Sequence, residues 1–267
     1  MIEIQTFEEI TQIRMSREIG GNPLYWVAAY LVDGLLIDTG CSYTAGELMS
    51  YLEKYPPKWV ANTHYHEDHI GANRATQERF GINIYAHPQA VPLIGRSATL
   101  FPYQEQVWGY PEPSEVLPIP PVIQTERFSF EVIEAPGHSA DHVALFERSK
   151  GWCFSGDIFA GEAVRVIRPE EDMETTVASL ERLAALETQR LALFTSSGRI
   201  VEDGRKALQE CAGYLRSLSR KAKDLQAQGR TAQEIMNALF GGEHPRAQRT
   251  NGQFTTENLI RSVLKMG

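Results

Sequence analysis

Residues 63–69 read THYHEDH, and this short stretch is the most specific pattern in the sequence. It contains three of the seven histidines, and it follows the apolar run Trp59-Val60-Ala61. Its potential ligands converge on one point if the loop curls back over the end of a strand. Imidazole and carboxylate together suit zinc, iron or manganese better than calcium or magnesium, which prefer oxygen ligands. The stretch predicts a metal site whose candidate ligands are His64, His66, Asp68 and His69.

Strand and helix patterns alternate around this stretch. The apolar runs 25–32 and 35–37 are joined by Asp33-Gly34, which predicts a β-hairpin. The other expected strands are residues 59–61, 82–85, 128–133, 143–146, 152–154 and 191–194, and none is expected after residue 198. The expected helices are residues 45–54 and 71–79 and one that begins after the N-cap Asp172. This order predicts an α/β layered domain.

Two later segments add ligand types after predicted strands. Residues 136–142 read PGHSADH, and Gly156-Asp157 directly follows the strand 152–154. Layered sheets gather their active sites at the carboxyl ends of strands. Asp157 alone would be read as a turn residue, but the histidine cluster favours a role as a bridging metal ligand.

The HxHxDH run, with Asp38 in LIDTG before it and Gly137-His138 and Gly156-Asp157 after it, resembles the metallo-β-lactamase superfamily of metal-dependent hydrolases. The resemblance covers about residues 20–200. It implies a four-layered αββα sandwich with one or two metal ions at one edge of the sheets. In this family the aspartate at the position of Asp38 supports the site without binding metal.

The resemblance also implies a role for each ligand. One metal ion is expected to bind His64, His66 and His138. The other is expected to bind Asp68, His69 and the bridging Asp157. Asp68 would also orient the nucleophile and pass a proton to the leaving group. His142 is expected to orient a ligand through a hydrogen bond, as groups behind metal ligands commonly do.

One position departs from the family pattern. Members with two metals usually carry a further histidine after the last strand, but here residues 194–198 read FTSSG. Ser197 is therefore expected at that position. A hydroxyl is a poorer ligand than imidazole, so the second metal should be held more weakly than the first. A single-metal enzyme and a non-catalytic relative are the alternatives.

The charge pattern divides the chain of 267 residues, whose net charge is −8. Residues 199–267 hold 12 basic and 7 acidic side chains, whereas residues 1–198 hold 14 and 27. We expect a metal-binding domain over 1–198 and a C-terminal helical region over 199–267. A heptad-spaced seam over 208–225 could pack on the main domain or on a second copy in a homodimer. Further helices are expected after the capping box 231–234 and over 256–265.

Composition and motifs exclude several classes of protein. No apolar run approaches the roughly 18 residues that span a bilayer. Glu3, Glu8 and Glu9 precede any apolar stretch, so no secretory signal is expected. Cys41 and the other two cysteines are too few and too widely spaced for a disulfide framework. A cytoplasmic location is the simplest expectation, although a mature form without its signal would look the same. Dinucleotide, P-loop and serine-hydrolase motifs are absent.

Residues 91–121 contain seven prolines with aromatic residues between them. We expect no regular element to run through this segment. A long ordered loop in a compact domain is often functional, so a lid over a pocket is one interpretation. A surface loop that is pinned by its aromatic residues is the other.

The expected activity follows from the metal, for which zinc is the first expectation and iron or manganese are alternatives. Bound zinc lowers the pKa of its water to about 7, which gives hydroxide at neutral pH. The family resemblance favours hydrolysis of a thioester, lactone or related ester, as in hydroxyacylglutathione hydrolases. Arg249 is a candidate contact for a small anionic substrate.

Two other functions remain open. A phosphodiesterase or nuclease of the same fold is one, but the acidic main domain and the mixed charges of the tail argue against nucleic acid. A metal-binding regulatory protein, with catalysis weakened at Ser197, is the other.

Overall fold

The computed structural model describes residues 1–267, which form two compact units. The first unit comprises residues 1–134, 141–157 and 188–202, and the second comprises 135–140, 158–187 and 203–267. The domain boundary between residues 198 and 199 was predicted from charge and from hydrophobic periodicity, and it stays a prediction. The two compact units divide the chain differently, because residues 158–187 group with the C-terminal helices.

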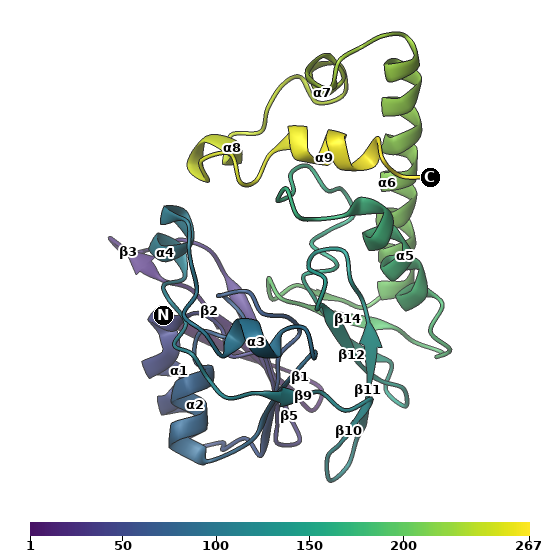
Figure 1. The fold of residues 1–267 in the computed structure, drawn as a ribbon. Helices are drawn as coiled ribbons and strands as arrows, with labels where there is room; N and C mark the ends of the chain where they lie inside the picture. Colours follow the sequence, from purple (N-terminus) through teal and green to yellow (C-terminus); the bar gives the residue numbers. More distant parts are fainter. The chain divides into compact units, whose positions relative to one another are not determined.

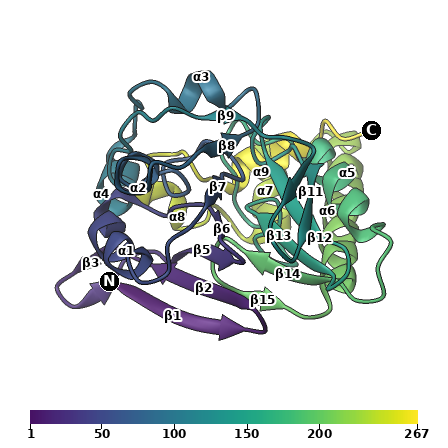
Figure 2. The ribbon, with the colours of Figure 1, turned by 90° about the horizontal axis from the view of Figure 1, so that it is seen from below.

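The first unit contains two large β-sheets (Figure 1). The first sheet has the strand order β1-β2-β5-β6-β7-β8-β9. Its strands are β1 (Ile2–Phe7), β2 (Ile10–Met15), β5 (Val27–Val32), β6 (Leu35–Ile37), β7 (Trp59–Ala61), β8 (Ile84–Ala86) and β9 (Leu117–Pro118). Figure 2 shows β1, β2 and β5 side by side. β3 (Glu18–Ile19) and β4 (Asn22–Pro23) form a separate short hairpin.

The second sheet has the strand order β10-β11-β12-β13-β14-β15. Its strands are β10 (Val122–Gln124), β11 (Ser129–Glu134), β12 (Val143–Glu147), β13 (Trp152–Gly156), β14 (Ala192–Thr195) and β15 (Ile200–Val201). The sequence predicted no strand after residue 198, so β15 corrects that expectation. The α/β class with layered sheets is confirmed.

An apolar core fills the space between the two sheets. Tyr30 and Ile37 from the first sheet pack in one cluster with Phe130, Phe154 and Phe194 from the second. Side chains alternate across a strand, so each sheet presents every second residue to this layer. The Tyr30 hydroxyl is buried there and donates to the Thr195 carbonyl at 2.6 Å, which ties β5 to the end of β14. Burial raises the pKa of this hydroxyl, so it stays protonated and remains a donor.

A second core cluster lies between the first sheet and its helices. It includes Leu48 and Leu52 of α1 (Ala45–Leu52), as the predicted helical pattern required. A short 3-10 turn, η1 (Ser42–Thr44), precedes α1. The next helix is α2 (Asn73–Phe80), which ends at Gly81 in the left-handed conformation. β6, β7 and β8 are mutually parallel, with α1 and α2 in their crossover connections.

The proline-rich segment is more regular than expected. It contains α3 (Val91–Ile94) and α4 (Pro102–Val107), and β9 pairs with β8. Proline is tolerated in the first turn of a helix because the amide that it lacks would have no partner inside the helix. Pro92 and Pro102 both occupy such positions. No single element runs through residues 91–121, but two short helices and one short strand form within them, which the sequence analysis did not predict.

The second unit is mainly helical. Its helices are α5 (Met173–Ala184), α6 (Gly204–Ala227), α7 (Ala232–Phe240), α8 (Arg246–Arg249) and α9 (Thr256–Val263). The predicted N-cap Asp172, the seam on α6 and the capping box at Thr231 are all confirmed. α5 packs along α6, and α9 packs against both.

No helix of the structure is both long and apolar enough to cross a membrane. The three cysteines are buried and free.

Candidate metal centre

The first unit brings its predicted ligands together at the carboxyl ends of parallel strands. β6 and β7 run parallel, so Asp38 after β6 and residues 62–69 after β7 leave the sheet at the same edge. The Asp38 amide donates to the Ala61 carbonyl at 2.9 Å, and the Thr39 amide donates to the His69 carbonyl at 2.8 Å. These backbone bonds fold the histidine loop back over the strand ends, as the sequence predicted.

Asp38 fixes the orientation of His69 through a hydrogen bond. Its carboxylate is buried and accepts from His69 Nδ1 at 2.7 Å, and it also accepts from the Thr63 amide and hydroxyl, both at 2.8 Å. A carboxylate accepts but does not donate, so the proton of a neutral His69 lies on Nδ1 and the lone pair lies on Nε2. Asp38 adopts a positive φ of 60°, a backbone conformation that is strained for residues other than glycine. The family resemblance implied a supporting role for this aspartate, and that role stays a prediction.

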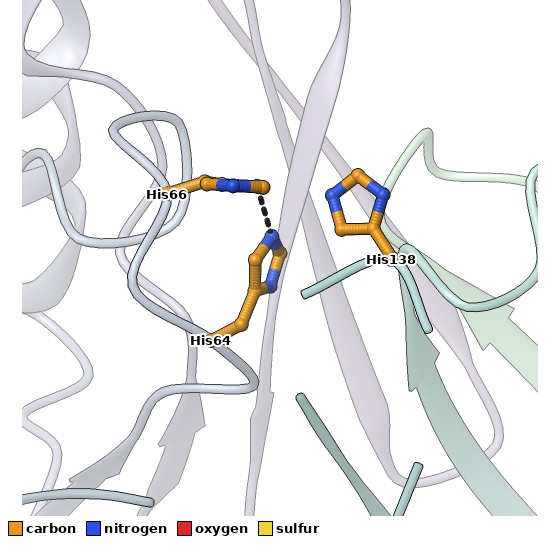
Figure 3. Close-up of side chains that lie close together, drawn as sticks. All are labelled: His64, His66 and His138. Atoms are coloured by element: carbon orange, nitrogen blue, oxygen red, sulfur yellow. Dashed lines mark hydrogen bonds between the residues drawn. The ribbon is translucent and has the colours of Figure 1, made fainter. Parts of the chain in front are cut away.

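Thr63 orients His64 in the same way. Because the Thr63 hydroxyl gives its proton to Asp38, it can only accept from His64 Nδ1, which lies 3.1 Å away. The Nε2 of His64 then carries the lone pair and lies 2.9 Å from His66 Nδ1 (Figure 3). Two ligand atoms on one tetrahedral zinc ion lie roughly 3.4 Å apart. A small outward shift of either ring therefore makes room for a shared ion.

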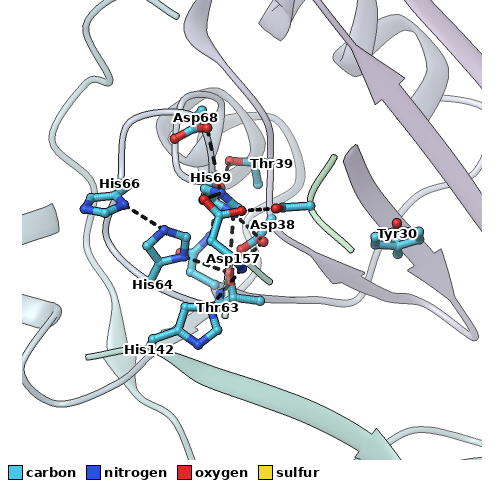
Figure 4. Close-up of polar contacts among 12 residues, drawn as sticks. Tyr30, Asp38, Thr39, Thr63, His64, His66, Asp68, His69, His142 and Asp157 are labelled. Atoms are coloured by element: carbon cyan, nitrogen blue, oxygen red, sulfur yellow. Dashed lines mark hydrogen bonds and ion pairs between the residues drawn. The ribbon is translucent and has the colours of Figure 1, made fainter. Parts of the chain in front are cut away.

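His69 and Asp157 form the second part of the cluster with His64. One ligand atom from each of these three residues lies within 4.8 Å of the others. His69 Nε2 is buried without a hydrogen bond, and it lies 3.7 Å from Asp157 Oδ2 and 3.9 Å from Asp68 Oδ2 (Figure 4). These separations are too long for hydrogen bonds but suit donors that share one divalent ion. The residues of this cluster therefore fit a metal ion.

The electrostatics of the cluster also favour a cation. Burial lowers the pKa of His69, but the carboxylates of Asp38, Asp68 and Asp157 outweigh burial and raise that pKa well above 6.5. Three carboxylates around one imidazole stabilise positive charge at this point. A divalent ion would supply that charge in place of a proton.

Asp157 is positioned by a hydrogen bond to His142 and by the backbone conformation of Gly156. Its amide donates to His142 Nε2 at 3.0 Å, so His142 contacts a predicted ligand residue. Gly156 adopts a φ of 51°, and a β-carbon there would lie 2.5 Å from His142 Nε2. Only glycine allows this close approach of the backbone to the ring.

The structure differs from the sequence analysis at the two serines after β14. The hydroxyl of Ser196, rather than that of Ser197, donates to Asp157 Oδ1. Ser197 instead lies with its hydroxyl 3.1 Å from that of Thr195. β14 runs parallel to β13, so Ser196 follows β14 where Asp157 follows β13. Sequence spacing could not tell which of the two adjacent serines contacts Asp157. The register of β14 against β13 places Ser196 there.

Two further contacts fix the loop and were missed in the sequence. The buried Asp141 accepts from the Tyr65 amide at 2.9 Å, between His64 and His66. The buried Glu67 accepts from the Gln104 side chain of α4 at 2.7 Å. This second bond ties the proline-rich segment to the histidine loop. Neither partner could be found from local sequence because each pair is far apart in the chain.

His138 and Arg249 belong to the second unit. His138 is buried beside Glu171, whose carboxylate lies 3.2 Å from His138 Nδ1. Arg249 is an exposed residue of α8. Metal binding by His138 and substrate binding by Arg249 stay predictions.

Replacing Asp38 with asparagine is expected to weaken metal binding about tenfold to a hundredfold, the usual effect of losing a group behind a ligand. An amide facing His69 Nδ1 donates its proton, which moves the ring proton to Nε2 and blocks the lone pair. Competition with a chromophoric chelator measures the affinity. Asp203→Asn is the matched control, because asparagine caps α6 as well as aspartate does. Equal affinities in the two variants would contradict the role of Asp38.

Comparison with known proteins gives a consistent result. Residues 27–194 match the family model described as the metallo-beta-lactamase superfamily. Hydroxyacylglutathione hydrolase GloC from Haemophilus influenzae is 30% identical over 125 residues, which are 44% of this chain and 58% of that protein. Atrochrysone carboxyl ACP thioesterase from Aspergillus fumigatus is 25% identical over 215 residues, 76% of this chain and 61% of that protein. The chain therefore matches less than two thirds of the length of either relative.

A solved structure extends the likeness to nearly the whole chain. The metallo-beta-lactamase family protein from Thermus thermophilus superimposes with a TM-score of 0.66 over 95% of this chain and 90% of that one. Its sequence is 18% identical, so the likeness concerns the fold alone.

Proposed function

The chain belongs to the metallo-beta-lactamase superfamily, and from that premise we propose that it is a metal-dependent hydrolase of a thioester or a related acyl ester. The observation that carries the proposal is the cluster of His64, His69 and Asp157, in which the buried Nε2 of His69 faces two carboxylates without a hydrogen bond. Within the proposal His64, His66 and His138 hold one divalent ion, and Asp68, His69 and Asp157 hold a second.

A divalent ion held by these residues would lower the pKa of a water molecule and so supply hydroxide at neutral pH. The protein's own groups then orient the reaction. Asp38 and Thr63 keep the lone pairs of His69 and His64 directed into the cluster. Asp68 is proposed to orient the attacking water and to pass its proton to the leaving group. Ser196 fixes one oxygen of Asp157 and leaves the other directed toward His69.

A thioester is the proposed substrate class for two reasons. The names of two relatives refer to a hydroxyacylglutathione and to a thioesterase. A thiol has a pKa of about 8.5, so a thiolate leaves with little help from an acid. A serine in place of a further imidazole would weaken the second metal, and a good leaving group tolerates that loss. We propose zinc as the native metal, with iron or manganese as alternatives.

We further propose that the substrate is small and anionic. The C-terminal residues 199–267 carry 12 basic and 7 acidic side chains, a net charge of +5, and Arg249 is exposed among them. The seam on α6 buries Leu208 and Leu215 within the chain, and a homodimer stays a prediction.

The test is a panel assay on the full chain after metal removal and reconstitution. The substrates are an S-acyl glutathione thioester, a lactone, bis-p-nitrophenyl phosphate and a β-lactam, each with zinc, manganese or iron(II). We expect thioester hydrolysis that is absent after chelation and returns with metal. Turnover of the phosphodiester alone would identify a phosphodiesterase instead. Full metal occupancy with no turnover of any substrate would contradict the proposal and favour a regulatory protein.

A further inference from the structure

The loop that carries His138 is anchored on the first two turns of α5. The Asp172 amide donates to the Gly137 carbonyl at 2.9 Å, and the Ser179 hydroxyl donates to the Pro136 carbonyl at 2.6 Å. Gly137 adopts a φ of 139°, and a β-carbon there would lie 2.4 Å from the Thr176 hydroxyl. Because the backbone packs this tightly on the helix, the position of His138 depends on how α5 begins.

Glu171 lies just before that first turn and contacts the His138 ring. Its Oε2 lies 3.2 Å from His138 Nδ1, and both side chains are only 9% exposed. The carboxylate can only accept, so the proton lies on Nδ1 and the Nε2 of a neutral ring carries the lone pair. Carboxylates that fix the tautomer of a ligand histidine in this way also raise its basicity.

Glu171 is in turn held by the C-terminal part of the chain. Its other oxygen, Oε1, accepts from the Arg168 amide at 2.8 Å. The Ser262 hydroxyl of α9 accepts a hydrogen bond from the Met173 amide at 2.9 Å. The same hydroxyl donates to the Glu171 carbonyl at 3.4 Å. One side chain of α9 therefore contacts the backbone on both sides of Asp172.

A second set of contacts fixes the residues just before Glu171. Ile167 and Thr255 exchange two backbone hydrogen bonds, of 3.2 and 3.1 Å. The Asn258 side chain donates to the Ile167 carbonyl at 3.2 Å, and the Arg168 guanidinium lies 5.0 Å from the centre of the Phe254 ring. Residues 167–173 are thus held at both ends by residues 254–262.

We propose that Glu171 is a positioning residue for the ligand His138 and that α9 and the residues before it hold Glu171 in place. The C-terminal helices then support metal binding through a carboxylate of their own unit, in addition to any contact with substrate. This inference rests on the proposed function, because it assumes that His138 binds metal.

The test compares metal affinities by competition with a chromophoric chelator, using zinc alone and the full chain. Glutamine has one acceptor oxygen, so Glu171→Gln loses one of the two hydrogen bonds, to His138 or to Arg168. We expect zinc affinity to fall about tenfold to a hundredfold. Glu170→Gln removes the same charge from the exposed neighbouring residue and should leave the affinity unchanged. An equal affinity of these two variants would overturn the proposal.

A double-mutant cycle separates positioning from a general structural effect. If Glu171 acts through His138, Glu171→Gln should change zinc affinity by less than about twofold once His138 is alanine. An undiminished effect in that background would overturn the positioning role. Unchanged zinc affinity in His138→Ala itself would instead contradict the proposed metal site. The two failures are therefore distinguishable.

Ser262→Ala tests the contribution of α9. Removing the hydroxyl leaves the Met173 amide without its acceptor and frees the Glu171 carbonyl. We expect a loss of zinc affinity in the same direction as Glu171→Gln but smaller. Wild-type affinity in Ser262→Ala would overturn the part assigned to α9.

Discussion

His64→Ala is expected to lower kcat/KM for the proposed thioester substrate by about a thousandfold. A metal ion contributes several kcal/mol to transition-state stabilisation, and about 4 kcal/mol corresponds to that factor. His64 has the largest expected effect because its ring lies against His66 and also shares the cluster with His69 and Asp157. Its loss therefore removes a donor next to both proposed ions. Elemental analysis of the purified variant should show less than the wild-type metal content.

His244→Ala is the matched control for this experiment. His244 lies just before α8, where its ring accepts from the Arg246 amide, and we assign it no role in the metal site. This variant should keep both metal content and activity. Circular dichroism of both variants checks that the fold is retained. Wild-type metal content and activity in His64→Ala would contradict the site.

Phe154→Ala is expected to lower the free energy of unfolding by about 3–5 kcal/mol, the usual cost of emptying a buried aromatic position. The Phe154 ring is 1% exposed in the layer between the sheets. It stacks on Phe194 with centroids 4.9 Å apart and meets Tyr30 edge-on at 5.3 Å. Alanine would leave a cavity beside the end of β14, which Ser196 directly follows. Urea denaturation measures the loss.

Phe101→Ala provides the comparison for the core substitution. Phe101 has the same side chain but is 45% exposed at the start of α4. Surface truncations usually change stability by less than about 0.5 kcal/mol. A loss in Phe154→Ala no larger than in Phe101→Ala would show that the packing between the sheets contributes little.

Local patterns predicted the elements whose structure depends on nearby residues. The Asp33-Gly34 turn was identified from its dipeptide, which tolerates the positive φ that both residues adopt. The capping box at Thr231 likewise satisfies its own helix end. β1 and β2 were not predicted, although they pair with each other across Glu8-Glu9, because that turn lacks the Asn-Gly or Asp-Gly signal of a tight hairpin. The short helices α3 and α4 were missed because prolines were read as breakers rather than as first-turn residues.

The candidate site shows the same difference between local patterns and distant contacts. His64, His66, Asp68 and His69 lie within one short loop, so their spacing alone identified them as candidate ligands. The groups that orient them come from distant segments. Asp141 meets Tyr65 from 76 residues away, and Ser196 meets Asp157 from 39 residues away. Such contacts depend on sheet register, which a single sequence does not specify.

The interleaving of the two units has a consequence for synthesis on the ribosome. β14 and β15 complete the second sheet, yet α5 precedes them in the chain and packs with α6 and α9. During N-to-C synthesis α5 therefore emerges before either of these partner helices, and its contacts with them form only after α6 and α9 have been made.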